Sequence, residues 1–322
     1  MHDERARDGL GLGQNDYCPF DIDHVADNFG LATVTVQTAY GGIVSRVSKE
    51  RLGEAATLYI HGVGADWSTW TPLMHAETTD QLKVHDQIFI DLPGFGDSEN
   101  RLGTLKIADV GEAVLSVASS LGYKTLRIVG HSMGGFLTLD MASRYPERVE
   151  SIHLVAGPYF SILTTIQNPV AGFKYSPKSA AAFETQYVFS LTGRAGVALA
   201  KAFYTIGAGR TVLFPVASHP FDLRQSVVRA LFYEQNPQGL LETAANGPGY
   251  DADRQWAKIS CPIWAVFGDK DWLVPPHDMQ RFLRCQPAAA CTLLKDSSHM
   301  MHVERPFDVL AALALWDSSR TS

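Results

Sequence analysis

Three short segments of the chain carry residues whose types could support nucleophilic catalysis. The letters GHSMG at 130–134 fit the pattern G-x-S-x-G, two aspartates lie within 269–271, and two histidines lie within 299–302. A serine attacks a carbonyl when a histidine accepts its proton and a carboxylate holds that histidine in the right tautomer. The three segments therefore predict acyl transfer.

The serine of the first segment has the context that this chemistry requires. An apolar run at 126–129 precedes Ser132, and a helical pattern over 133–146 follows it. A tight turn from strand to helix forces the serine backbone into a strained conformation and needs small neighbours, which the glycines supply. The start of the following helix offers a backbone N–H and a partial positive charge to a developing oxyanion. We therefore predict that Ser132 is the nucleophile.

The elements that must position these residues follow an alternating order of strands and helices. Five short apolar runs end at or near Gly or Pro, as strands buried on both faces of a parallel sheet do. They lie at 57–62, 87–94, 126–132, 151–157 and 263–269, and a last strand is predicted at 291–296. Residues 31–36 and 42–48 alternate apolar and polar side chains and predict a hairpin. Helices are predicted at 107–122, 133–146 and 306–318, so we expect an α/β protein with a mostly parallel sheet.

One interval interrupts this order. Residues 158–252 contain no strong strand run but many aromatic side chains, and they predict a mostly helical insertion. About a third of these aromatics are expected to line a cleft, because ligand sites are mostly apolar. The remaining boundaries follow: a poorly ordered arm over 1–30, and a core domain formed by 31–157 and 253–322.

The motifs together resemble the α/β-hydrolase superfamily, in particular its capped, esterase-like serine hydrolases. Besides the serine motif, the resemblance rests on HGVGAD at 61–66, DLPGFGDS at 91–98, and GDKD at 268–271 followed by Ser298 and His299. It covers roughly 30–157 and 255–315. It implies the α/β-hydrolase fold, a sheet flanked by helices with a mainly helical cap inserted between the sixth and seventh strands.

The resemblance also assigns roles to single residues. It places the acid at Asp271, the second aspartate of its segment, and the base at His299, while Asp269 is expected to form a turn. It places the oxyanion hole at the backbone N–H groups of Val63 and Met133. The strand ending at 155 carries no carboxylate in VAGPY, which agrees with an acid at Asp271.

Further residues near these motifs are expected to shape the site. His61 is expected to pin its loop by hydrogen bonding, and His302 to anchor the last helix with Glu304. Aromatic side chains beside the motifs could line a substrate pocket; these are Trp67, Trp70, Tyr159 and Trp272.

Composition excludes several other classes of protein. The net charge of −7 argues against a nucleic-acid partner, because a nucleic-acid surface would need a clustered basic face. No apolar run approaches the roughly 20 residues of a membrane span, and the N-terminus lacks the apolar stretch of a secretory signal. The four cysteines are scattered without a CxxC pair, which favours reduced thiols, a cytoplasmic location and no zinc site. The histidines show no metal-ligand spacing and no dinucleotide motif is present, so neither metal nor cofactor is expected.

The chain is therefore expected to hydrolyse a small-molecule carboxylic ester through an acyl-enzyme, with thioesters and lactones as further substrates. The pocket should prefer small or medium apolar acyl or alkoxy groups. Alternatives on the same scaffold are carbon–carbon bond hydrolases, which more often carry asparagine where this chain has His131, and perhydrolases. A non-enzymatic small-molecule receptor is a third alternative, since some family members with an intact triad bind ligands without turnover.

Overall fold

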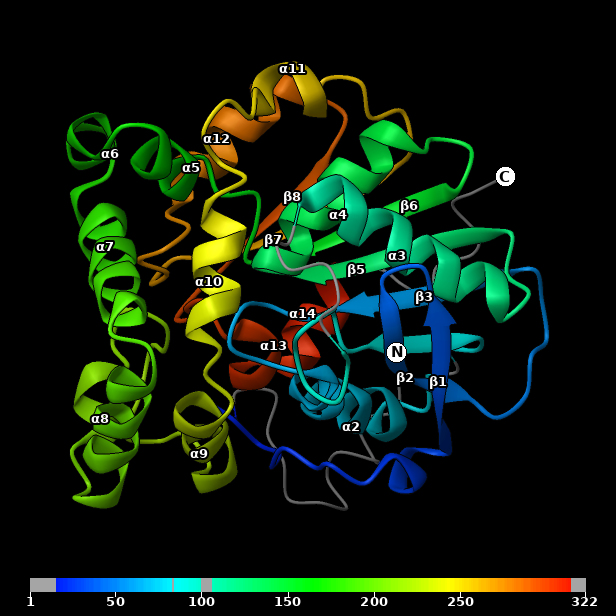
Figure 1. The fold of residues 1–322 in the computed structure, drawn as a ribbon, viewed down its shortest axis with the longest axis horizontal. Coiled ribbons are helices and arrows are strands. Elements are labelled where there is room, and N and C mark those ends of the chain that lie inside the picture. The colour runs from blue at the N-terminus through cyan, green and yellow to red at the C-terminus, as the bar shows by residue number, and fades with distance from the viewer. Residues whose placement is uncertain (1–15, 83, 100–105, 314–322) are drawn as a thin grey trace.

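An eight-stranded sheet runs through the centre of the molecule (Figure 1). The structure, a computed structural model, describes residues 16–82, 84–99 and 106–313. The strands are β1 (Leu31–Thr38), β2 (Gly41–Ser48), β3 (Ala55–Ile60), β4 (Gln87–Ile90), β5 (Thr125–His131), β6 (Val149–Val155), β7 (Ile263–Gly268) and β8 (Ala290–Leu294). Their order is β1-β2-β4-β3-β5-β6-β7-β8, and all neighbours from β4 to β8 pair in parallel. The predicted hairpin and the mostly parallel sheet are confirmed.

The central strands are buried on both faces because each face packs against its own apolar core. On β3, Leu58 and Ile60 belong to one core and Tyr59 between them belongs to the other, as expected when successive side chains point to opposite faces. This two-sided burial explains why these strands are continuous apolar runs in the sequence. The register pairs Ile60 with Gly130 and His131 with Val155. The carboxyl ends of β3, β5 and β6 therefore lie side by side, and the loops that follow these three strands meet there.

Helices cover both faces of the sheet (Figure 1). On one face lie α3 (Ile107–Ser120), α4 (Met133–Arg144), α11 (Ala252–Trp256) and α12 (Pro276–Cys285). On the other lie α2 (Thr71–Thr79), preceded by the 3-10 turn η2 (Trp67–Trp70), and α14 (Pro306–Leu313), preceded by α13 (Met301–Glu304). The helix predicted over 306–318 is seen to Leu313, and its last part lies outside the described residues. Within the described part of the chain, no helix has the length and apolar character needed to cross a bilayer.

The insertion between β6 and β7 is helical, as predicted, and stands beside one edge of the sheet in Figure 1. It contains α5 (Phe160–Gln167), α6 (Pro169–Tyr175), α7 (Pro177–Leu191), α8 (Arg194–Thr205), η3 (Gly209–Val212), α9 (Gln225–Tyr233) and α10 (Pro237–Ala244). Its helices begin at recognisable signals. Pro occupies the first turn of α6, α7 and α10, and the side chains of Asn168 and Asn236 accept hydrogen bonds from the first turns of α6 and α10.

The N-terminal segment differs from expectation over residues 16–30. We expected a poorly ordered arm over 1–30, and residues 1–15 lie outside the described residues. Residues 16–30 instead form η1 (Ala26–Phe29) and pack between the insertion and α13. Cys18 is buried, its N–H donates to the Glu304 carbonyl at 2.7 Å, and Arg224 of the insertion donates to the Pro19 carbonyl at 2.8 Å. The segment is mostly polar, so the sequence analysis overlooked its few buried apolar residues, Cys18 and Ile22, which hold it against the insertion.

Candidate active site

Ser132 stands on the turn between β5 and α4, in a backbone conformation with φ 52° and ψ −123°. A left-handed φ is costly for a residue with a side chain and recurs at functional turns. The turn also needs glycine on both sides. A Cβ at Gly130 would clash with the Thr138 hydroxyl and the Gly134 carbonyl, and a Cβ at Gly134 would clash with the Ile60 carbonyl. The predicted role of the small neighbours is confirmed.

The structure brings Ser132, His299 and Asp271 into one hydrogen-bonded chain. The Ser132 Oγ and His299 Nε2 atoms are 2.9 Å apart, and His299 Nδ1 and Asp271 Oδ2 are also 2.9 Å apart. All three side chains are buried. The second oxygen of Asp271 accepts N–H bonds from Leu273 and Val274 at 2.8 and 2.9 Å, which fixes the carboxylate toward the imidazole. This is the arrangement in which a histidine can take the serine proton as the hydroxyl attacks a carbonyl.

The neighbouring aspartate has a different environment. Asp269 accepts a weak N–H bond from Ser297 at 3.4 Å and lies 3.8 Å from the Lys295 ammonium group. It makes no contact with His299 among the described interactions. This agrees with the expectation that Asp269 forms a turn.

The loop after β3 lies directly beside Ser132. A Cβ at Gly62 would lie 2.8 Å from His131 Nδ1 and 3.1 Å from Ser132 Cβ, so only glycine lets the two turns approach so closely. The ring of His61 holds this loop, because Leu92 N–H donates to Nε2 at 3.1 Å and Nδ1–H donates to the Gly62 carbonyl at 2.7 Å. Val63 and Met133 both line the cavity that opens at Ser132. Neither of their backbone N–H groups has a hydrogen-bond partner among the described residues.

His131 packs against His299, His302 packs against His131, and both His131 and His302 remain uncharged. Burial lowers the pKa of His302 to about 3 and lowers the pKa of His131 well below its usual value. The ring centroids of His131 and His299 are 5.1 Å apart, and His131 Nε2–H donates to the His299 carbonyl at 3.0 Å. A neutral neighbour does not repel the positive charge that His299 would carry after taking a proton. His131 thus supports the base loop, a role that the sequence analysis missed because nothing local in GHSMG reveals a contact 168 residues away.

Glu304 ties the loop of His299 to the insertion. Its carboxylate accepts hydrogen bonds from Ser298 N–H at 2.7 Å and from Ser218 N–H at 3.0 Å. Burial raises the pKa of Glu304 to about 7. His302, the other predicted anchor, lies 3.1 Å from the Thr69 hydroxyl through its Nε2. Both residues therefore connect loops around the base, as expected for structural anchors.

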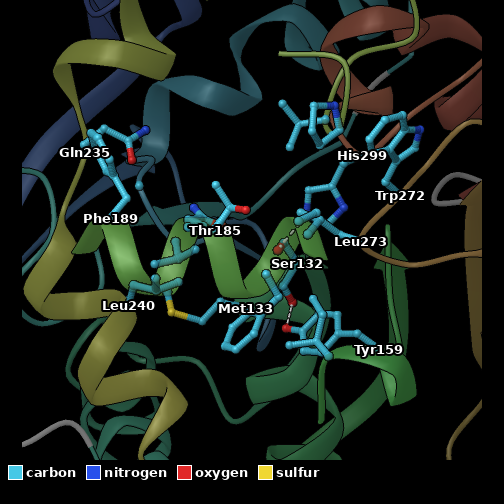
Figure 2. Close-up of a pocket in the computed structure, with 18 of the residues that line it drawn as sticks. Ser132, Met133, Tyr159, Thr185, Phe189, Gln235, Leu240, Trp272, Leu273 and His299 are labelled. Carbon is cyan, nitrogen blue, oxygen red and sulfur yellow. Dashed lines mark hydrogen bonds between the residues drawn. The ribbon is translucent and has the colours of Figure 1, made fainter. Parts of the chain in front are cut away.

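A cavity of about 540 Å³ opens at Ser132 between the sheet edge and the insertion (Figure 2). Figure 2 shows Ser132, His299 and Met133 on its core side and Phe189 and Thr185 of α7 across from them. Five of the fourteen aromatic residues of 158–252 line it, close to the expected third; they are Tyr159, Phe183, Phe189, Phe203 and Phe232. Among the described residues that line the cavity, none is Asp, Glu, Lys or Arg.

Two of the four aromatic residues expected at the pocket do line it. Tyr159 and the half-exposed Trp272 are both at the cavity wall. Tyr159 also hydrogen-bonds the Ser132 carbonyl and accepts the Phe136 N–H at 3.2 Å, so it links the insertion to the nucleophile turn.

The expectation for Trp67 and Trp70 as pocket residues is wrong. Both are buried in the apolar core on the other face of the sheet and are absent from the cavity wall. The Trp67 N–H donates to Asp91 at 3.0 Å. Sequence proximity to the loop of 61–66 was misleading because both indole rings pack into the core that covers the opposite face of the sheet.

One group of potential metal ligands lies outside the cavity. His24, Asp66 and Glu234 have ligand atoms within 4.8 Å of one another in the described part of the chain. Within this group, His24 Nε2 and Glu234 Oε1 are 3.7 Å apart. Burial raises the pKa of Glu234 to about 8.

A family profile and several known proteins match this chain. The family profile described as alpha/beta hydrolase fold matches residues 58–306, which is most of the chain. A region of 119 residues is 34% identical to the dihydrolipoyllysine-residue acetyltransferase component of the acetoin cleaving system of Cupriavidus necator. That match covers 36% of this chain and 30% of the relative, so the chain matches only about a third of the length of that protein.

Two further proteins show the range of the similarity. A 2-hydroxy-6-oxononadienedioate/2-hydroxy-6-oxononatrienedioate hydrolase of Paraburkholderia phymatum is 29% identical over 123 residues, 38% of this chain and 43% of that protein. The crystal structure of carboxylesterase CesB from Bacillus subtilis superimposes with a TM-score of 0.67 and 19% identity, covering 91% of this chain and 95% of that one. At this identity the superposition shows the shared fold, and it includes the insertion as well as the sheet.

Proposed function

This chain belongs to the α/β-hydrolase family, and on that premise we propose that it is a serine hydrolase that cleaves carboxylic esters with apolar groups. The observation that carries the proposal is the chain from Asp271 through His299 to Ser132, with both links at 2.9 Å, at the mouth of an apolar cavity. A hydrolase of this family with a buried, paired histidine beside a serine at the cavity wall is equipped for an acyl-enzyme route.

The proposed reaction has two halves. His299 accepts the Ser132 proton while the hydroxyl oxygen attacks the ester carbonyl, and the protonated His299 then returns the proton to the leaving alcohol. Water attacks the resulting acyl-enzyme with His299 again as base, which releases the acid and restores the serine. The N–H groups of Val63 and Met133 are proposed to stabilise the oxyanion in both halves, each contributing about 3–4 kcal/mol. Their lack of partners among the described residues supports this assignment.

The cavity supports an uncharged, apolar substrate. Its polar side chains besides the triad are few, chiefly Thr185, Gln186, Gln235 and Thr243. A carboxylate or ammonium group on the substrate would lose its hydration there without meeting an opposite charge, which is costly. The volume of about 540 Å³ lies within the range of drug-sized ligand sites. Medium-length acyl or alkoxy groups fit this space.

Carbon–carbon bond hydrolysis is the second candidate, because one relative is named as a dienedioate hydrolase. A dioate carries two carboxylates. The described wall of the cavity offers no Lys or Arg to pair with them, so this candidate is the less favoured one.

A substrate panel separates these possibilities. We expect butyrate and octanoate esters of one alcohol to be turned over, and the succinate monoester to have a kcat/KM lower by about tenfold or more. Thioesters and lactones belong in the same panel, since they share the acyl-enzyme route. A clear preference for succinate would remove the apolar-substrate proposal, and ligand-induced stabilisation without turnover of any member would instead identify a receptor.

A further inference from the structure

Helix α8 exposes an apolar face to solvent. Leu199, Phe203 and Ile206 follow one another at i, i+4 and i+7, so they share one side of the helix. Their exposed fractions are 51%, 37% and 74%. In a globular protein such a stripe normally faces the core. Here α8 lies at the outer margin of the insertion, away from the sheet (Figure 1), and the stripe faces outward.

This exposed stripe is continuous with the substrate cavity. Phe203 lines the cavity and is partly exposed, and Val212 of η3 also lines the cavity while 50% exposed. We call Leu199, Phe203, Ile206 and Val212 the apolar ridge. Exposed apolar surface of this kind marks a site of interaction with another apolar phase or molecule. The ridge therefore connects the outside of the insertion with the space above Ser132.

The segment of 177–212, which carries the ridge, is basic although the whole chain is acidic. Residues 177–212, which form α7, α8 and η3, contain four basic residues and a single acidic one, Glu184. The basic residues are Lys178, Arg194, Lys201 and Arg210. The whole chain has a net charge of −7. An apolar strip with basic residues on the same helices is the composition of segments that lie at a lipid surface.

We propose that the apolar ridge is a docking surface for an anionic lipid surface, from which the enzyme draws an apolar ester into its cavity. This rests on the proposed function for the fate of the ester, although docking itself does not require turnover. A second copy of the chain is the less suitable occupant, because a two-fold interface formed by this segment would bring two net-positive segments together. Anionic headgroups are attracted by the net positive charge of residues 177–212, while the acyl region receives the apolar side chains.

The binding test uses the full chain with Ser132→Ala, so that no lipid is hydrolysed. Protein is sedimented with vesicles of phosphatidylcholine containing about a third phosphatidylglycerol, and with phosphatidylcholine vesicles alone. Binding should be stronger to the anionic vesicles and should weaken with added salt. The double variant Leu199→Gln with Ile206→Gln should lower the partition coefficient by about tenfold or more.

A matched control changes equally exposed apolar residues elsewhere. Val25 and Leu52 are 53% and 64% exposed and lie outside the insertion, so Val25→Gln with Leu52→Gln should leave vesicle binding unchanged. With Ser132 intact, the ridge variant should keep wild-type turnover of a soluble short-chain ester, since neither Leu199 nor Ile206 lines the cavity. Turnover of an ester embedded in anionic vesicles should fall in parallel with binding.

Three results would overturn the proposal. The first is a wild-type chain that does not bind anionic vesicles, and the second is equal loss of binding in the ridge and control variants. The third is sedimentation equilibrium that shows a wild-type dimer converted to a monomer by the ridge variant, which would make the ridge a contact between copies. Failure of the proposed function shows separately, as absent turnover of soluble esters by a protein that still binds vesicles.

Discussion

The sheet and the insertion use their apolar residues in different ways. In the central strands each apolar side chain enters a core on one face of the sheet or the other, as Leu58 and Tyr59 show on β3. In the insertion neighbouring apolar residues diverge: Ala200 is buried, Phe203 borders the cavity, and Ile206 lies in solvent. The groups proposed for bond cleavage are held by loops of the sheet, whereas most of the cavity wall comes from the insertion.

This difference suggests that the loops of the sheet determine the rate of reaction and that the insertion determines substrate preference. Substitutions at the sheet edge should change the rate for every substrate, because they alter the reacting groups. Substitutions in the insertion should change which substrate is preferred, because they alter only the wall.

The largest effect is expected for the nucleophile. Ser132→Ala should lower kcat for all esters by about 10³–10⁶, because the residues of a triad act as a unit. Labelling by a fluorophosphonate should vanish with it. The folded state should be retained, as checked by circular dichroism, and a variant that kept more than about a tenth of wild-type turnover would refute the mechanism.

The two aspartates after β7 should differ sharply. Asp271→Asn should lower kcat by about 10²–10⁴, because its bond to Nδ1 selects the tautomer of His299. Asp269→Asn is the matched control and should act mainly on stability, since Asp269 contacts the turn at Ser297. Steady-state kinetics of the two variants decide the point, and equal losses would overturn the assignment of the acid.

The buried carboxyl group of Glu77 allows a test of stability that does not involve the active site. Burial raises the pKa of Glu77 from 4.5 to about 7, where it meets Tyr59 and Gln87 at 3.1 and 3.0 Å. Above pH 4.5 the unfolded chain loses the Glu77 proton while the folded chain keeps it, so stability falls as pH rises to about 7 and then levels off.

Glu77→Gln should remove this loss. The variant should exceed wild type in free energy of unfolding by up to about 3 kcal/mol at pH 8, and the difference should shrink toward pH 5. Urea denaturation at both pH values measures it. The same measurement on Glu50→Gln, a substitution at an exposed position, supplies the matched control. A pH-independent difference for Glu77→Gln would show that its charge state is the same in both states of the chain.

The smallest effect is expected in the insertion. Phe189→Ala removes a ring from the cavity wall, so kcat/KM for long acyl esters relative to butyrate should rise by about tenfold, with little change in kcat for butyrate. Phe173 lies on α6 outside the wall, and Phe173→Ala should leave the ratio unchanged. A large fall in kcat for every ester after Phe189→Ala would break the proposed division between the two regions.

The sequence by itself determined the architecture of the sheet and the positions of the central motifs. Buried parallel strands need apolar side chains on both faces, so their runs are visible without a structure. The turn at Ser132 tolerates only glycine at Gly130 and Gly134, which made it equally visible. The choice of Asp271 over Asp269 came from the family resemblance, and the structure agrees with it by placing Asp271 against His299.

Only the tertiary structure decided where side chains of one type end up. Trp67 and Trp70 belong to a core rather than the pocket, and residues 16–30 are held by contacts to Glu304 and Arg224, more than 200 positions away along the chain. An aromatic or aliphatic residue in a helix has the same periodicity whether it faces a core, a cavity or solvent. Long-range packing makes that choice, and it leaves the stripe of α8 exposed beside the cavity.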